Sequence, residues 1–352
     1  MSQEKITLEL GENSYDILLE YGCLDRVGEL LNLSRKVLVV TDSGVPAEYA
    51  DAVAAASLAA EVVRIPKGES SKNFEHFHMI LRRMLSFGMG RGDCVVAAGG
   101  GVVGDMAGFA ASCYMRGIDF YNIPTTVLSQ VDSSIGGKTA IDLDGIKNVV
   151  GAFYQPHRVL VDPRTLSTLP RRQIANGLAE AVKMSLCFDA DSFARFEAMD
   201  MDREMTALAA GEPVPALERI IANALRTKKN VVEQDEKEHG LRRVLNFGHT
   251  LGHGIESMHG ENGLLHGECV VLGMLPLCSE AVRDRLLPVL KKLGLPVTCS
   301  ADPDRVMQAV LHDKKMYAGK ARAILVEEIG SFIEKELAPE ELRKIYTDYY
   351  LQ

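Results

Sequence analysis

The sequence predicts an α/β domain with a parallel sheet over residues 1–165, followed by a mostly α-helical domain over residues 166–352. In the first part, short apolar runs alternate with helix-like stretches, which is typical of a parallel sheet. In the second part, almost every periodic segment is helical. The chain has 352 residues, and domains typically hold about 50–200 residues. Two domains are therefore expected, with a small-molecule site in the cleft between them.

The first elements alternate between strand and helix patterns. Residues 6–10 and 15–19 alternate apolar and polar side chains on either side of Gly11, Glu12 and Asn13, which predicts a β-hairpin. Further strands are expected at residues 36–41, 61–65 and 94–98, and a helix at residues 69–87.

The helical part follows from the 3.6-residue spacing of its apolar side chains. Helices are expected at residues 171–186, 214–238, 247–258, 267–285 and 302–312. One strand-like segment, residues 321–326, precedes a final helix from Pro339 onward.

Composition and charge exclude several classes of protein. The formal net charge of -9 argues against nucleic acids and anionic membranes as partners. No apolar run approaches the ~20 residues of a membrane span, and the first residues do not resemble a signal peptide. The seven cysteines are scattered without CxxC spacing, which favours reduced thiols. We therefore expect a cytoplasmic protein.

A glycine-rich segment follows the strand expected at residues 94–98 and opens a helix. Gly99, Gly101 and Gly104 match the GxGxxG pattern, in which backbone N–H groups and the helix dipole bind a pyrophosphate. A tight turn that has no room for a Cβ atom is the alternative. The nearest downstream acid, Asp119, lies short of the usual ~20-residue spacing for a ribose ligand. Asp42, at the end of a strand, is the other candidate, although such an aspartate also suits a turn or an N-cap.

Three candidate metal ligands lie in the helical part: Glu180, His249 and His266. Two histidines and a carboxylate suit a catalytic Zn²⁺ with an open coordination position. Spacing alone favours another pair, His249 and His253, because residues four apart share a helix face. The residues by themselves leave both sets open.

Basic side chains accompany these groups despite the acidic total. They are Lys138, Lys147, Lys183, Lys228, Arg242 and the pair Lys314 and Lys315. Several cations together would bind the phosphate and carboxylate groups of an anionic substrate. Each one taken singly is equally consistent with a solvated surface cation.

Short sequence blocks that carry the glycines, candidate ligands and cations described above recur through most of the chain. They are Gly68–Lys72, Gly99–Asp105, Pro124–Thr126, Asp132 with Gly136–Lys138, Lys147–Asn148, Leu178–Lys183, Asp235–Glu236, Asn246–His253, Leu265–Glu268 and Asp313–Lys315. Taken together, these blocks resemble the 3-dehydroquinate synthase family of sugar phosphate cyclases.

The resemblance implies a homodimeric lyase that converts 3-deoxy-D-arabino-heptulosonate 7-phosphate to 3-dehydroquinate and phosphate, in the shikimate pathway. It implies transiently reduced NAD and a divalent metal, Zn²⁺ or Co²⁺, as cofactors. The metal would bind Glu180, His249 and His266, with His253 outside the coordination shell. The residues implied for NAD are Asp42, Glu69, Lys72, Gly100, Gly101, Asp105, Thr125, Thr126, Lys138, Lys147, Thr165 and Thr168.

The resemblance also implies a set of residues that hold the substrate. They are Asp132, Lys138, Asn148, Lys183, Lys228, Arg242, Asn246 and His253, with Arg116 reaching the neighbouring subunit's site. Either Lys314 or Lys315 would contact the substrate as well. The alternatives are a sugar phosphate cyclase for a different heptulose phosphate, a metal-dependent polyol dehydrogenase, and a nucleotide-binding sensor without catalysis.

Overall fold

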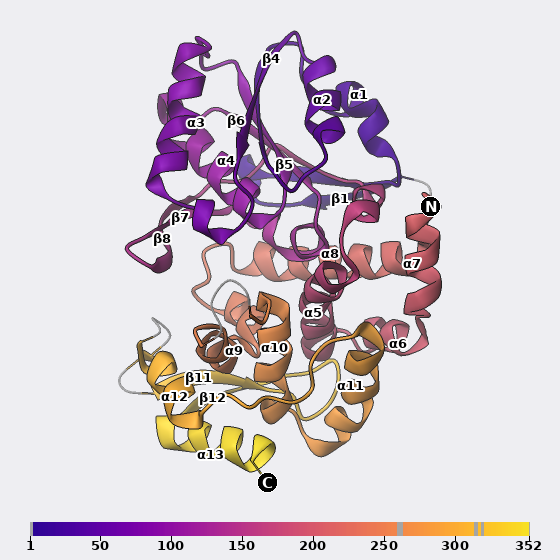
Figure 1. The fold of residues 1–352 in the computed structure, drawn as a ribbon, viewed down its shortest axis with the longest axis vertical. Helices are drawn as coiled ribbons and strands as arrows, with labels where there is room; N and C mark the ends of the chain where they lie inside the picture. The colour runs from indigo at the N-terminus through magenta and orange to yellow at the C-terminus, as the bar shows by residue number, and fades with distance from the viewer. Residues whose placement is uncertain (1–2, 259–262, 313–315, 318–319, 352) are drawn as a thin grey trace.

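The computed structural model describes residues 3–258, 263–312, 316–317 and 320–351, which form a sheet-containing half followed by a helical half (Figure 1). The main sheet has the strand order β1-β2-β9-β6-β5-β3-β4 within the described residues. Its strands are β1 (Glu4–Leu8), β2 (Tyr15–Leu19), β3 (Lys36–Asp42), β4 (Ala59–Ile65), β5 (Cys94–Gly99), β6 (Asp119–Pro124) and β9 (Arg158–Val161). Across the sheet, β2, β9, β6, β5, β3 and β4 each pair in parallel with the next strand, and β1 pairs antiparallel with β2. The predicted parallel sheet and terminal hairpin are confirmed.

Helices cover both faces of this sheet, because its strands bury both sets of side chains. Along β3, Val37 and Val39 pack against α1 (Val27–Leu30) and α2 (Ala47–Ala55). Leu38 and Val40 point to the other face, where α3 (Phe74–Ser86) and α4 (Gly101–Cys113) lie. The helix expected at residues 69–87 begins later, since Glu69–Ser71 forms a separate 3₁₀ turn and Asn73 caps α3 by accepting from His76 N at 3.0 Å.

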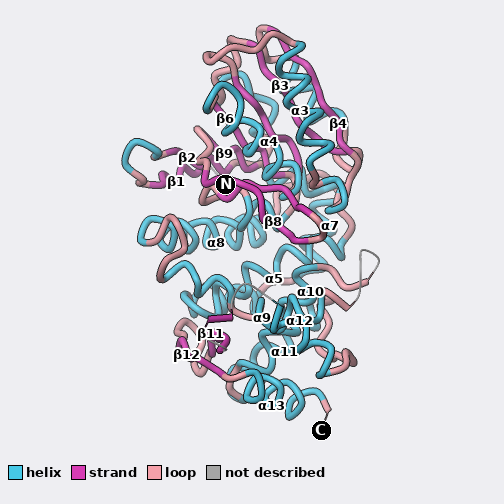
Figure 2. The backbone as a smooth tube through the Cα atoms, turned by 90° about the vertical axis from the view of Figure 1, so that its left-hand side faces the viewer, coloured by secondary structure: helices cyan, strands magenta, loops and turns pink. Residues whose placement is uncertain are grey.

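A hairpin of β7 (Lys138–Leu143) and β8 (Ile146–Phe153) forms a separate two-stranded sheet that the sequence did not predict. In both views it lies at the level where the two halves meet (Figure 1, Figure 2). The 3₁₀ turn Pro163–Thr168 then connects β9 to the helical half.

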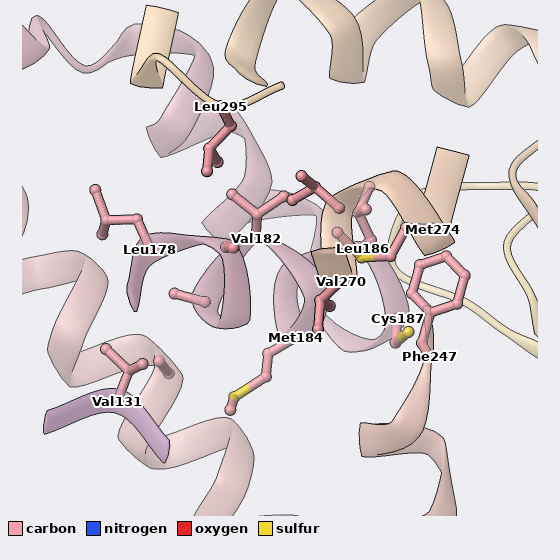
Figure 3. Packing of buried hydrophobic residues seen from close by; sticks show 14 of the residues in the cluster. Val131, Leu178, Val182, Met184, Leu186, Cys187, Phe247, Val270, Met274 and Leu295 are labelled. Carbon is pink, nitrogen blue, oxygen red and sulfur yellow. The ribbon is translucent and has the colours of Figure 1, made fainter. Parts of the chain in front are cut away.

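Helix α5 (Arg171–Phe188) is the centre of the helical half. Every residue from Ile174 to Cys187 is buried, so the helix packs on all sides. Figure 3 shows Val182, Leu186 and Cys187 of α5 among Phe247, Val270 and Met274. The other helices of this half are α6 (Ala190–Ala198), α7 (Met201–Ala209), α8 (Pro215–Gln234), α9 (His249–Glu256), α10 (His266–Met274), α11 (Glu280–Leu293), α12 (Pro303–His312) and α13 (Pro339–Tyr350).

Two expectations for the helical half were wrong in detail. The single helix expected at residues 267–285 is two helices, α10 and α11, separated by a short 3₁₀ turn, Leu275–Leu277, that contains Pro276. Proline has no N–H to continue a helix, and Ser279 starts α11 by accepting from Val282 N. The lone strand at residues 321–326 is β11 (Lys320–Leu325), which pairs with β10 (Met316–Tyr317) and β12 (Ile333–Leu337). In the part of the chain that is described, no helix combines the length and apolar character needed to cross a bilayer.

Candidate active site

The residues implied for NAD gather at the carboxyl ends of adjacent parallel strands. Asp42 ends β3, Gly100 and Gly101 follow β5, and Thr125 and Thr126 follow β6. Glu69 and Lys72 come after β4, and Thr165 and Thr168 come after β9. Because β9, β6, β5, β3 and β4 are neighbours, these segments meet at one edge of the sheet, where ligands of open α/β sheets bind.

The glycine turn is tightly packed. A Cβ atom on Gly99 would lie 2.6 Å from the side chain of Val103, and Thr125 N donates to Gly99 O at 2.9 Å. Cβ atoms on Gly100 and Gly101 would lie 3.1 Å from Thr126 and Ser133. Close packing within the turn is therefore a sufficient reason for these glycines. The backbone N–H groups at the N-terminus of α4 lie in the same turn, so a pyrophosphate site there is consistent with the packing as well.

Lys72 connects the glycine turn to the hairpin. Its ammonium lies 2.6 Å from Asp105 Oδ2 and 3.7 Å from Glu69 Oε1, and it also donates to Asn148 Oδ1. Burial raises the pKa of Asp105 to about 6, although the Lys72 ammonium opposes that rise. Asn148 has a positive φ of 55° and its N–H donates to Asp142 at 2.7 Å, so the turn of the hairpin holds its side chain toward Lys72.

Asp42 makes a local contact, with Oδ1 accepting from Gly44 N at 2.6 Å. A hydrogen bond of this kind is what an aspartate in a turn makes, which is the alternative that the sequence left open for Asp42. The assignment of Asp42 to the ribose stays a prediction.

Glu180, His249 and His266 place one ligand atom each within 4.8 Å of one another, and we call this group the metal cluster. They come from α5, α9 and α10, which pack side by side (Figure 1). The Nε2 atoms of His266 and His249 lie 3.3 and 3.6 Å from Glu180 Oε1. The metal cluster therefore unites the consecutive helices α9 and α10 with α5, which lies much earlier in the sequence.

Glycines bring these helices together. A Cβ atom on Gly267 would lie 2.0 Å from Asn176 O of α5, and one on Gly248 would lie 2.6 Å from Val270 O of α10. Gly267 N also donates to Asn176 Oδ1 at 2.6 Å, one turn before Glu180. The first residue of α10, His266, is thereby held against the middle of α5.

The residues of the metal cluster fit a divalent cation. Glu180 is fully buried, and its carboxylate lies against the Lys183 ammonium on one side and the two histidine rings on the other. Burial raises its pKa, but the adjacent Lys183 ammonium and His266 outweigh burial and lower it to about 2. A buried, ionised carboxylate facing two imidazole nitrogens is a ligand set that Zn²⁺ or Co²⁺ accepts.

His253 lies beside the cluster. Its ring centroid is 5.4 Å from that of His249 and 6.0 Å from that of His266. It shares a second group of possible ligands with Glu256 and His266. Sequence reasoning missed Glu256, although its position seven residues after His249 and three after His253 places it on the same helix face.

A second group, which we call the anion pocket, consists of Asp132, Lys138, Lys228, Arg242 and Asn246. Lys228 is buried and donates to Asp132 Oδ1 and O, both at 2.5 Å. Arg242 is 2% exposed and donates to Gly136 O at 3.1 Å. The half-exposed Lys138 and the amide of Asn246 both contact the carboxylate of Glu238, which sequence reasoning also missed.

The charges of the anion pocket and the metal cluster are connected. Burial lowers the pKa of Lys183, but the carboxylates of Glu180 and Asp132 raise it above its usual value. Burial, helped by the Arg242 guanidinium and opposed by Asp132, lowers the pKa of Lys228 to about 8. The anion pocket therefore holds more positive charge than its own carboxylate neutralises.

Two further assignments lie apart from these groups. Arg116 is exposed, at the end of the 3₁₀ turn Tyr114–Arg116, with a positive φ of 72°. Lys314 and Lys315 lie outside the described residues, so the structure says nothing of them.

Two family models match consecutive parts of the chain. Residues 62–176 match the model of the 3-dehydroquinate synthase N-terminal family, and residues 177–316 match that of the 3-dehydroquinate synthase C-terminal family. The 3-dehydroquinate synthase of Pelobacter propionicus is 42% identical, over 96% of this chain and 97% of that protein.

Two solved structures share the fold. A 2-epi-5-epi-valiolone synthase from Streptomyces hygroscopicus subsp. jinggangensis, with NAD⁺ and Zn²⁺ bound, has a TM-score of 0.86 and 29% identity over 97% of this chain and 98% of that one. A 2-deoxy-scyllo-inosose synthase complexed with carbaglucose-6-phosphate, NAD⁺ and Co²⁺ has a TM-score of 0.85 and 25% identity over 99% and 100%. The fold is thus that of the sugar phosphate cyclases. Within that class, this chain belongs to the 3-dehydroquinate synthase family.

Proposed function

We propose that this chain is a 3-dehydroquinate synthase, a lyase that converts 3-deoxy-D-arabino-heptulosonate 7-phosphate to 3-dehydroquinate and phosphate. The observation that carries the proposal is the anion pocket beside the metal cluster, in a chain of this family. A substrate with both phosphate and carboxylate groups needs several cations, and a neutral polyol needs none of them.

The metal cluster would hold Zn²⁺ or Co²⁺, as in the two solved relatives. A bound metal would supply Lewis acidity toward the substrate's hydroxyl groups, and NAD⁺ would accept a hydride and return it within one turnover. The chain's own contribution is a buried, ionised Glu180 that Lys183 keeps in place. His253, whose ring lies next to those of both ligand histidines, is assigned to the substrate rather than to the metal.

Substrate binding is assigned to the anion pocket together with Asn148, Lys183 and His253. Lys228 and Arg242 are buried, so their charges act on a bound anion with little screening by solvent. Asp132 holds the Lys228 ammonium through its side chain and its backbone carbonyl. The pocket is thereby arranged before the substrate arrives, which reduces the entropy lost on binding.

NAD binding is assigned to the edge of the sheet. The backbone N–H groups at the N-terminus of α4 suit a pyrophosphate, and Asp42 and Asp105 supply carboxylates for hydroxyl groups. Lys72, Lys147 and Lys138 supply nearby positive charge. The boundary between the two domains near residue 165 is part of the same proposal.

The activity test uses purified protein with NAD⁺, Zn²⁺ and the heptulosonate phosphate. We expect inorganic phosphate and dehydroquinate in equal amounts, without accumulation of NADH. Phosphate release only from a heptulose phosphate that lacks the carboxylate would indicate another cyclase, and NADH accumulation with a simple polyol would indicate a dehydrogenase. Either result, or the absence of product, would overturn the proposal.

We also propose a homodimer in which Arg116 reaches the partner's site. The β7–β8 hairpin supports this, because its two-stranded sheet has open edges and exposes the apolar side chains of Ile146, Val149 and Phe153. Arg116 is itself exposed. Sedimentation should give twice the mass of the chain. Mixing inactive Arg116→Ala and His266→Ala subunits should restore partial activity, and a monomer or a mixture without activity would contradict the proposal.

A further inference from the structure

Glu256 is a carboxylate that the proposed reaction does not use. It is the last residue of α9, on the face that carries His249 and His253. It is about one-fifth exposed, and its carboxylate contacts the side chains of Lys147 and His266. Its surroundings therefore place a carboxylate close to the metal cluster.

The ring of His266 lies between two carboxylates. Its Nε2 atom is 3.3 Å from Glu180 Oε1, inside the metal cluster, and its Nδ1 atom is 3.3 Å from Glu256 Oε2. A histidine that binds a metal through Nε2 keeps its proton on Nδ1, and that N–H needs an acceptor. Glu256 is in position to accept it.

The other ligand histidine has an equivalent acceptor of a different kind. His249 Nδ1 lies 3.1 Å from the backbone carbonyl of Phe247. That carbonyl orients His249 through the fold of the chain and cannot be removed by substitution. Glu256 serves His266 through a side chain, so its contribution can be measured.

The second carboxylate oxygen of Glu256 faces the other half of the molecule. Glu256 Oε1 accepts from Lys147 Nζ at 2.8 Å, and Lys147 belongs to β8 of the hairpin. One carboxylate therefore joins a metal ligand of the helical half to a residue implied for NAD in the first half. Both oxygens of Glu256 are therefore engaged, one by a metal ligand and the other by the hairpin.

We propose that Glu256 is a positioning residue that fixes the tautomer and orientation of His266, and that Lys147 influences the metal cluster only through Glu256. The inference rests on the proposed metal cluster. A surface ion pair between Lys147 and Glu256 without this role would contribute little, since the Lys147 side chain is 57% exposed.

The test measures Zn²⁺ affinity of the full-length protein by competition with a chromophoric chelator, with no nucleotide or substrate present. We expect one Zn²⁺ per chain, and an affinity about 10–100-fold lower in Glu256→Ala, the range for loss of such a supporting carboxylate. The Zn²⁺ affinity of Glu256→Gln should lie between those of the wild type and Glu256→Ala, because the glutamine amide oxygen still accepts from His266 Nδ1–H but carries no charge. The visible spectrum of the Co²⁺-loaded protein should shift in Glu256→Ala, which a loss of general stability would not produce.

Two further variants test the path through Lys147. Lys147→Met should weaken Zn²⁺ binding less than Glu256→Ala and should have no additional effect in the Glu256→Ala background. Glu197→Gln removes a surface carboxylate paired with Arg285 and should leave Zn²⁺ affinity unchanged.

The outcomes separate this inference from the proposed function. A wild-type chain that binds no Zn²⁺ overturns the metal cluster and the inference together. Normal Zn²⁺ affinity in both Glu256 variants overturns the positioning role alone. An equal effect of Lys147→Met in the wild-type and Glu256→Ala backgrounds overturns the connection to the hairpin.

Discussion

The metal cluster takes all three side chains from the helical half, whereas the anion pocket takes Asp132 and Lys138 from the first half and Lys228, Arg242 and Asn246 from the second. The metal cluster is therefore assembled inside one packed core. The anion pocket is complete only where the two halves meet. The difference teaches that the ligand side chains of the metal cluster are held together by helix packing alone, whereas the anion pocket depends on the alignment of the two halves.

The two sites also differ in the pKa values of their buried lysines, Lys183 and Lys228. Lys183 pairs with Glu180 and its pKa is raised, because two carboxylates outweigh the effect of burial. Lys228 pairs with Asp132, yet burial and neighbouring cations lower its pKa to about 8. Lys183 therefore holds its proton more firmly than a free lysine does, and Lys228 holds its proton less firmly.

The largest difference is expected between two histidines at the edge of the metal cluster. His266→Ala should abolish both metal binding and turnover, because it removes a ligand. His253→Ala should keep one Zn²⁺ per chain and lose about 10²-fold in kcat, because it removes a side chain assigned to positioning the substrate. Metal analysis of dialysed protein together with steady-state kinetics measures both, and equal loss of Zn²⁺ in the two variants would place His253 in the coordination shell.

Lys183→Met tests how strongly the metal cluster depends on its buried ion pair. Removing one partner of a buried pair typically costs ~3–5 kcal/mol, because the remaining charge is uncompensated. Zn²⁺ should restore part of this loss, since a ligand that binds only the native state stabilises it. Urea unfolding with and without a chelator gives the free energies. Lys229→Met, which breaks a partly exposed pair with Glu233, is the control and should cost about 1 kcal/mol or less. Equal losses would contradict the difference in burial.

The pH dependence of anion binding tests the role of Lys228. Its folded pKa of about 8 is below the unfolded value, so the native state loses this proton first as pH rises, and the group's unfavourable effect on stability is relieved above about pH 8. Anion binding has the opposite dependence, because it needs the charged form. Sulfate affinity, measured by calorimetry, should fall as pH rises through about 8. In Lys228→Arg this fall should disappear up to pH 10, and an unchanged profile would assign the titration to another group.

The smallest effect is expected at the exposed edge of the anion pocket. Lys138 is half exposed and pairs with Glu238, so Lys138→Met should change the free energy of unfolding by no more than about 1 kcal/mol. Its loss of sulfate affinity should also be smaller than that of Lys228→Met, because solvent screens its charge. Equal losses of sulfate affinity in the two variants would show that burial of a cation does not determine how strongly it contributes to anion binding.

Local sequence patterns predicted the parts of the fold that depend on neighbouring residues. The apolar runs at residues 36–41, 61–65 and 94–98 became β3, β4 and β5, and the hairpin around Gly11 became β1 and β2. The break between α10 and α11 was missed, because the apolar spacing continues past Pro276. The β7–β8 hairpin was missed because β8 has no buried residue and only Thr139 and Ile141 of β7 are buried.

The residues of the candidate site likewise fall into those that sequence motifs indicated and those that only tertiary contacts revealed. Glu180, His249, His266 and the cations were proposed from motifs, yet spacing alone preferred His249 with His253. Those site assignments and the domain boundary at residue 165 stay predictions that the experiments above can test. Glu256 and Glu238 carried no motif, and only their contacts with His266 and Lys138 drew attention to them.

By itself, the sequence determined the strand and helix pattern, the glycine turn and, through its motifs, the resemblance to a family, because these depend on residues close together in the chain. Only the tertiary structure decided which charges are buried and which carboxylate faces each lysine and histidine. Those properties arise where α5, α9 and α10 pack and where the hairpin meets the helical half, and there removal from water changes pKa values and strengthens ion pairs.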